Sequence, residues 1–171
     1  TVVSAAELDK KIAAHTGEIS LAFDLSDDSV EQKLIRYAVA LNSNDVFIVE
    51  GSKMGAWATD ASINKIAFDG KSLARLNGLA GITFDIDIAA YLVNPGTRAS
   101  SFEDIADKWG SALDSSSDIN FLASQATAAF GIKKNLEAEL AERNLTDLFT
   151  TLELPIASLL AIMENRGVAV D

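Results

Sequence analysis

Acidic side chains beside short apolar runs are the residues of this sequence that could do chemistry. Asp24 follows the alternating run 19–23, and Asp28 would share its face if that strand continued, because every second strand residue points to the same side. Asp85 and Asp87 are also two residues apart. Carboxylate oxygens suit Mg²⁺ or Mn²⁺, so either pair is a candidate metal site. A solvated acidic turn explains the first pair more simply, and a helix cap followed by an exposed acid explains the second.

Several other kinds of site are excluded by residue types. The sequence has no cysteine, which removes disulfides, thiolate catalysis and cysteine-based zinc sites. His15 is the single histidine, and no G-x-S-x-G nucleophile motif accompanies it. Lys71 follows Gly70 at a predicted helix start and could contact a phosphate, but a lysine on a helix surface is the simpler interpretation.

Composition indicates one acidic globular domain. The 171 residues are 49% hydrophobic, with 14 basic and 25 acidic side chains and a net charge of −11. A free-standing nucleic-acid binder needs clustered Lys and Arg, so this chain could sit beside DNA only if a linked domain supplied the basic surface. No stretch is expected to approach the ~20 apolar residues of a membrane span. We expect no membrane partner and a cytoplasmic location.

The pattern along the chain predicts strands followed by helices. Helix 4–15 precedes strand-like runs at 18–25, 34–41, 45–49, 65–68 and 82–84, with the polar turn 42–44 suited to a hairpin. Further helices are expected at 70–79, with Gly81 near its end, at 86–92 after Asp85, and from Ser100 onward. A long helix should cover 119–143 and a last one 145–165, kinked by Pro155 and ended by Gly167 in a left-handed cap. This order gives an α/β or α+β fold with a mixed sheet.

The last twenty residues carry an E-x-P element, an apolar helix and the run M-E-x-x-G-V-x-V-D. They resemble the segment that leads from the proofreading exonuclease domain into the polymerase thumb in bacterial DNA polymerase I and its relatives. Phe84-Asp85-Ile86 and Ala90-Tyr91-Leu92 resemble the family's F-D-T…Y-I-L stretch. The resemblance implies an α/β, ribonuclease H-like mixed sheet flanked by helices, with a helical C-terminal half. It also implies an exonuclease-like domain at 1–150, a linking helix and truncated thumb at 151–171, and a piece excised from a larger protein.

Two of the family's metal-binding motifs match this sequence imperfectly. The family's F-D-x-E motif resembles Phe23 to Ser26, which keeps the first acid as Asp24 but places Ser26 at the glutamate position. The N-L-K-x-D motif resembles Asp69 to Leu73, with Leu73 at the aspartate position. Ser26 and Leu73 offer no carboxylate charge to a metal ion.

The third motif, Y-x-x-x-D, resembles the run from Phe121 to Gln125 on the long predicted helix. Phe121 lacks the hydroxyl that orients water in the family, and Gln125 is a neutral amide in place of the acid. Three of the family's four acids are therefore replaced, and the resemblance implies a degenerate site without functional catalytic or metal residues. Asp24, Asp28 and Asp85 remain weak candidates for a metal.

The function implied by the resemblance is structural. We expect an inactive 3′–5′ proofreading domain that needs no cofactor itself and supports the polymerase domain of the same chain. Template-directed DNA synthesis with Mg²⁺, and most of the DNA contact, would belong to the full-length protein in replication and repair. Two alternatives stay open: an active metal-dependent exonuclease with a rearranged site of Asp24, Asp28 and Asp85, and a protein-interaction module using the more apolar groove.

Overall fold

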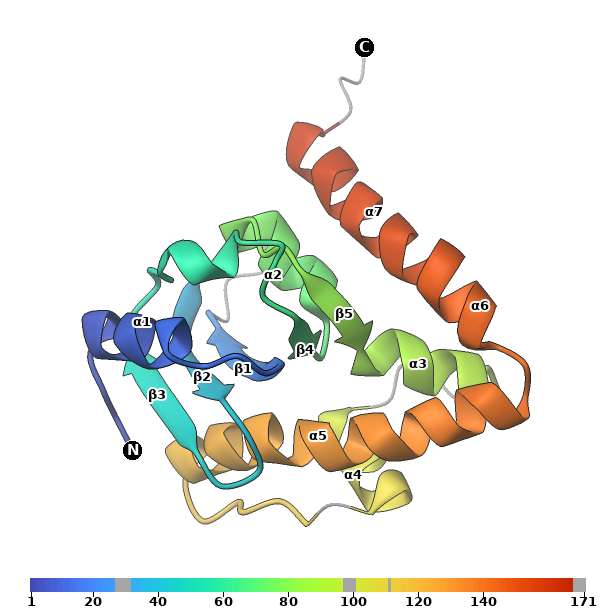
Figure 1. Ribbon diagram of the computed structural model, residues 1–171, viewed down its shortest axis with the longest axis horizontal. Helices are drawn as coiled ribbons and strands as arrows, with labels where there is room; N and C mark the ends of the chain where they lie inside the picture. The colour runs from blue at the N-terminus through green and yellow to red at the C-terminus, as the bar shows by residue number, and fades with distance from the viewer. Residues whose placement is uncertain (27–31, 97–100, 111, 168–171) are drawn as a thin grey trace.

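A mixed five-stranded sheet forms the centre of the computed structural model, which describes residues 1–26, 32–96, 101–110 and 112–167. The strand order is β3-β2-β1-β4-β5 (Figure 1). β2 pairs antiparallel with β1 and β3, whereas β4 pairs parallel with β1 and β5. The strands are β1 (Ile19–Leu25), β2 (Leu34–Ala40), β3 (Val46–Glu50), β4 (Lys65–Ala67) and β5 (Ile82–Asp85). The predicted strands and hairpin are confirmed.

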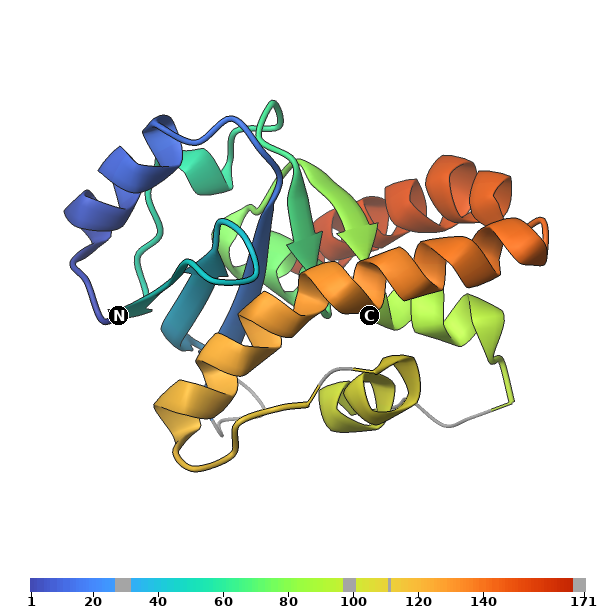
Figure 2. The same cartoon turned by 60° about the horizontal axis from the view of Figure 1, so that its bottom comes forward.

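Helices cover both faces of this sheet. Figure 2 shows the long helix α5 crossing one face, with α1 on the opposite side. Side chains of Ser4, Asp69, Asp85, Ser101 and Ser117 accept backbone N–H bonds at helix starts, which explains where these helices begin. The helical segments are α1 (Ala5–Ala13), η1 (Ala56–Ala58), α2 (Gly70–Asn77), α3 (Ile86–Val93), α4 (Phe102–Trp109), α5 (Asp118–Glu142), α6 (Thr146–Leu148), the π-helical η2 (Phe149–Glu153) and α7 (Leu154–Arg166).

Alternation along β1 decides which side chains can reach α5. Ile19 and Leu21 pack into the core cluster that includes Leu8 of α1. Ala22 packs instead with Ala126 of α5, in the cluster on the other side of the sheet. Because side chains alternate along a strand, Asp24 lies on the α5 side, the same side as Ala22.

A separate cluster lies where β4 and β5 meet the later helices. It includes Ile66, Phe84, Trp109 and Phe149, all buried, and Phe84 and Phe149 have ring centroids 4.9 Å apart. The segment after α5 is therefore packed into the domain at its beginning, and α7 continues from it past β5 to α2 (Figure 1). The expected boundary between 150 and 151 falls inside the π-helical segment η2.

Two predicted helix ends differ in detail. α2 ends at Asn77, and Gly78 rather than Gly81 adopts the left-handed conformation that caps it, with φ 68° and ψ 30°. Gly167 follows α7 with φ 65° but ψ 179°, so it is not the left-handed cap that was expected. Pro155 lies in the first turn of α7, immediately after the π-helical turn. Proline has no backbone N–H, so the regular hydrogen-bond ladder of an α-helix is interrupted at this position.

The expectation that no stretch could span a membrane is wrong by length and composition. The helical stretch Thr146–Arg166 is 21 residues long with a mean hydropathy of 1.4, and 11% of its most apolar window is buried. The expectation failed because the apolar residues of this helix outweigh the charged residues Asp147 and Glu153 in the mean hydropathy. One such helix is weak evidence for a membrane, and it establishes only that much of its apolar surface is not covered by the described residues.

Candidate functional site

A pocket of about 260 Å³ lies between β1 and the first turns of α5. Three phenylalanine rings, Phe68, Phe102 and Phe121, contribute to its wall together with Asp24 and Gln125. Its remaining lining residues are Leu21, Ala22, Phe23, Leu25 and Asp69. The groove is therefore open rather than filled, and it brings together three of the residues singled out from the sequence.

Asp24 is already paired with a cation. The β1–β2 register places Arg36 directly opposite it, and Arg36 Nε donates a hydrogen bond to Asp24 Oδ2. Arg36 Nη2 also donates to Asp118 Oδ2 at 3.4 Å, at the start of α5. Hydrogen bonding to Asp24 is the largest effect that raises the pKa of the Arg36 guanidinium above its ordinary value. The carboxylate at the first motif position therefore has a permanent internal partner.

Ser26 and Leu73 do not line this pocket. Ser26 lies beyond the end of β1, after a register irregularity between Asp24 and Leu25, and its Oγ accepts the backbone N–H of Lys33 at 2.9 Å. Leu73 is fully buried in the cluster on the opposite side, with Leu8 and Ile12 of α1. The leucine is part of the core, and an acid there would not face Asp24.

Asp69 is the second carboxylate in the pocket. It caps α2 from a left-handed backbone conformation (φ 54°, ψ 48°), which Asp tolerates better than most side chains. Its Oδ2 accepts the Ser72 hydroxyl at 2.6 Å, and its Oδ1 accepts the Ser72 N–H at 3.4 Å. Both oxygens of this acid are thus engaged locally.

Asp85 lies apart from Asp24 and acts as a helix cap. Its Oδ1 accepts the N–H groups of Asp87 and Ile88 at the start of α3, and its Oδ2 accepts Gly70 N–H at 2.8 Å, at the start of α2. The side chain is only 2% exposed, and burial raises its pKa to about 7 despite these hydrogen bonds. Burial likewise raises the pKa of Asp87. Asp85 therefore joins two helix starts and does not line the Asp24 pocket.

The remaining candidate, Asp28, lies outside the described residues. Among the residues that are described, no group of three or more His, Cys, Asp or Glu side chains is placed to hold a metal ion. The family resemblance implies two metal ions, each needing several anionic oxygens. The pocket offers two carboxylates, one paired with Arg36 and one with Ser72, so its donor set does not fit that pair of ions.

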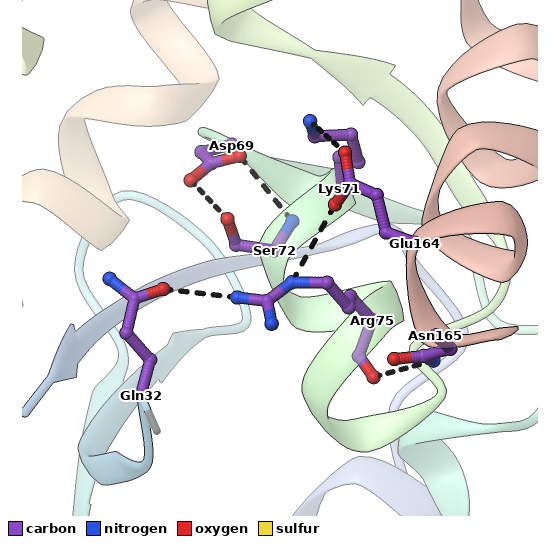
Figure 3. Close-up of polar contacts among 7 residues, drawn as sticks. All are labelled: Gln32, Asp69, Lys71, Ser72, Arg75, Glu164 and Asn165. Carbon is purple, nitrogen blue, oxygen red and sulfur yellow. Dashed lines mark hydrogen bonds and ion pairs between the residues drawn. The ribbon is translucent and has the colours of Figure 1, made fainter. Parts of the chain in front are cut away.

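Lys71 is used in a contact between helices. Its Nζ donates to Glu164 Oε1 at 2.9 Å, while Arg75 Nε lies 3.7 Å from Glu164 Oε2 (Figure 3). Asn165 Nδ2 also donates to the Arg75 carbonyl at 2.8 Å. These contacts join the far end of α7 to α2, so Lys71 lies on the helix surface, as the simpler interpretation had it, and forms an ion pair there.

Two residues of this region, Arg36 and Asp118, were missed by the sequence analysis, and the contact of Glu164, which belongs to the M-E-x-x-G-V-x-V-D run, was not anticipated. Arg36 stood in the predicted strand that directly follows the 18–25 strand in the sequence, so antiparallel pairing of these two strands could have suggested a position opposite 18–25. Its exact partner depends on the register, which is irregular between Asp24 and Leu25. The partners of Asp118 and Glu164 are 82 and 93 positions away in the chain, so no local pattern pointed to them.

Comparisons with known proteins find relatives of this chain. The family model described as DNA polymerase I, ribonuclease H-like domain, matches residues 26–121. DNA polymerase I of Bacillus subtilis is 26% identical over 174 residues, covering 86% of this chain and 20% of that protein. The Mycobacterium tuberculosis (strain H37Rv) polymerase I is 30% identical over 145 residues, covering 71% and 16%. The chain thus spans a fifth or less of these relatives' length.

The fold is also similar to a solved polymerase structure. The POL domain of Pol1 from M. smegmatis, in complex with a DNA primer-template and dNTP, matches with a TM-score of 0.81 and 24% identity. The match covers 98% of this chain and 31% of that one. The family model alone covers more than half of the sequence, and the expected mixed sheet flanked by helices is confirmed. The chain therefore belongs to the family of ribonuclease H-like, 3′–5′ exonuclease-like domains of bacterial DNA polymerase I.

Proposed function

We propose that this domain has lost 3′–5′ exonuclease chemistry and supports the polymerase part of a DNA polymerase I. One observation carries the first half of the proposal: Asp24, which resembles the family's first acid, is paired with Arg36 in a pocket whose other motif positions are Phe121 and Gln125. Such a pocket cannot supply the anionic oxygens that two divalent ions require. The domain itself would need no cofactor.

A nuclease assay tests this loss directly. A single-stranded oligonucleotide labelled at its 5′ end is incubated with the protein and Mg²⁺ or Mn²⁺, and shortening from the 3′ end is measured. We expect no shortening beyond that of an Asp24→Ala variant, with Asp107→Ala as a control at an exposed acid on α4. Metal-dependent shortening that disappears in Asp24→Ala, and persists in Asp107→Ala, would establish an active site.

The supporting role is proposed from the exposed surface of the last helical stretch. Leu148, Leu152, Ile156, Leu159 and Met163 recur every three or four residues and are all at least 36% exposed. Residues at this spacing share one face of a helix, although the π-helical turn shifts it slightly. Leu160 and Ile162 widen this stripe. An exposed apolar stripe of this kind is typical of a surface that another protein segment covers.

The proposed covering segment is the polymerase part that follows in the relatives. Glu164, Lys71 and Asn165 fix one end of α7 against α2, so the stripe would be presented in a defined direction (Figure 3). In a cytoplasmic parent protein, Mg²⁺-dependent DNA synthesis and most DNA contacts would belong to that part. The domain's net charge of −11 is consistent with weak or no DNA binding of its own.

This supporting role can be tested in a polypeptide that joins the domain to its polymerase part. Leu159→Asp with Met163→Asp should lower the thermal stability of the joined protein and shorten its primer-extension products. Asp107→Asn, on α4, serves as the matched surface control. Unchanged stability and product length in the double variant would show that the stripe does not contact the polymerase part.

The rearranged-exonuclease alternative now rests on Asp24, Asp69 and the undescribed Asp28, because Asp85 is buried as a helix cap elsewhere. The interaction-module alternative has one observation in its favour. The pocket is open and lined by three phenylalanines, so it could accept an apolar side chain of a partner. Loss of partner binding in a Phe121→Asp variant, with α7 unchanged, would separate this role from scaffolding.

A further inference from the structure

The surroundings of Asp24 show how the pocket differs from a metal site. Asp24 and Arg36 face each other across neighbouring antiparallel strands, on the same side of the sheet as Ala22 and Ala38. That side is covered by α5, which carries Phe121 and Gln125. A guanidinium therefore lies beside the carboxylate, on the face of the sheet where a bound cation would have to approach it.

Arg36 has a second carboxylate partner. Its Nε donates to Asp24 and its Nη2 lies 3.4 Å from Asp118 Oδ2, so one guanidinium connects β1, β2 and the first residue of α5. The Arg36 side chain is 22% exposed, which leaves it less hydrated than an ordinary surface arginine. Charge-assisted hydrogen bonds in a partly dry setting are stronger than exposed ones.

A divalent ion at Asp24 would meet two obstacles. It would lie next to a positive group, which repels it, and it would share the carboxylate with Arg36, whose Nε already donates a charge-assisted hydrogen bond to Asp24 Oδ2. An arginine cannot give up its proton at any pH at which proteins stay folded, so the obstacle is permanent. A histidine in the same place could be neutralised near neutral pH, whereas Arg36 cannot.

We infer that Arg36 is the resident cation of this pocket: it takes the electrostatic place of a divalent metal ion at Asp24 and excludes such ions from it. The inference deepens the proposed loss of exonuclease chemistry and rests on it. It is more specific, because it assigns the exclusion to one side chain and not to the missing acids alone.

The test is a titration with Mn²⁺ alone. Calorimetry measures the affinity, and paramagnetic broadening of backbone amide signals locates the bound ion. The variants are Arg36→Met, which removes the charge at similar length, and Arg36→Lys, which keeps it. Arg143→Met is the control, since Arg143 pairs with Glu139 at the far end of α5. We expect no localised broadening in the wild type, Arg36→Lys or Arg143→Met. In Arg36→Met, Mn²⁺ should broaden the amide signals around Asp24 and Gln125. Its affinity for this site should be at least about tenfold higher than in the wild type.

Two results would overturn the inference. One is Mn²⁺ binding at Asp24 in the wild type with an affinity similar to that of Arg36→Met. The other is a folded Arg36→Met variant that binds no Mn²⁺ at the pocket, since the missing acids would then suffice. If Arg36→Met does not fold, Arg36→Gln takes its place, and the wild-type titration still decides the first case. Nuclease activity is measured separately. A wild type that binds Mn²⁺ at Asp24 but has no nuclease activity would contradict only this inference and leave the proposed loss of exonuclease activity in place.

Discussion

Glu164, near the end of α7, accepts a hydrogen bond from Lys71 in the first turn of α2 at 2.9 Å. The two residues are 93 positions apart in the chain. The second carboxylate oxygen of Glu164 lies 3.7 Å from Arg75 Nε, one turn further along α2. One acid thus joins the end of α7 to α2, the helix that starts beside the pocket.

Glu164→Ala should loosen α7 without unfolding the domain. The pair is partly exposed, so its loss should lower the free energy of unfolding by no more than about 1 kcal/mol. Amide hydrogen exchange in 154–166 should nevertheless become faster, because α7 would lose its fixed end. Glu142→Ala, at an exposed acid near the end of α5, should leave that exchange unchanged. Equal exchange rates in both variants would show that the ion pair does not restrain α7.

Asp85 should make stability depend on pH. Its pKa is about 7 in the folded domain against an ordinary value of 3.8, with burial as the main cause. The folded state therefore binds this proton more tightly, so the stabilisation is complete below about pH 3.8 and is lost as the pH rises through about 7. Between about pH 3.8 and pH 7, the wild-type free energy of unfolding should therefore fall as the pH rises. Asp85→Asn should make this fall less steep, by up to about 1.4 kcal/mol per pH unit.

Urea unfolding at several pH values between about 4 and 7 measures that slope. Asp107→Asn, at an exposed acid of α4, is the matched control and should keep the wild-type slope. Asp87 also has a pKa raised by burial, and it is present in every variant. An Asp85→Asn protein with the wild-type slope would show that Asp85 stays ionised across the window.

Leu73 should respond as a core residue. Leu73→Ala should cost about 2–5 kcal/mol of unfolding free energy, and Leu73→Met less than about 1.5 kcal/mol, because the side chain is fully buried among leucines and isoleucines. Leu73→Asp, which puts back the family's acid, should be more destabilising than Leu73→Ala and should add no Mn²⁺ binding. A stable Leu73→Asp variant with a new metal site would mean that this position faces the pocket.

Phe121 and Gln125 should tolerate the family's side chains. Both line the open pocket and are only partly buried, so Phe121→Tyr with Gln125→Asp should change stability by no more than about 1 kcal/mol. We expect no exonuclease activity in this double variant while Arg36 is present. Thermal unfolding measures the change in stability, and the oligonucleotide assay measures exonuclease activity. Metal-dependent shortening by the double variant would show that the acids alone were limiting.

Much of the fold followed from local pattern. Alternation predicted β1 and its neighbours, and Asp85 marked a helix start that the structure confirms. The C-terminal run and the Phe84 to Leu92 stretch identified the family through residues close together in sequence. These features depend on neighbours within a few positions, which a sequence displays directly.

The pocket depended on distant contacts. The register of β1 against β2 decided that Arg36 lies opposite Asp24, and it includes an irregularity between Asp24 and Leu25. Packing of α2 against the sheet decided that Leu73 enters the core while Asp69 lines the pocket. The pairing of Glu164 with Lys71 arose in the same way, from two helices that meet only after folding. The sequence by itself determined which side chains were present, and the tertiary structure decided which charges neutralise one another, because electrostatic pairing depends on distance in space.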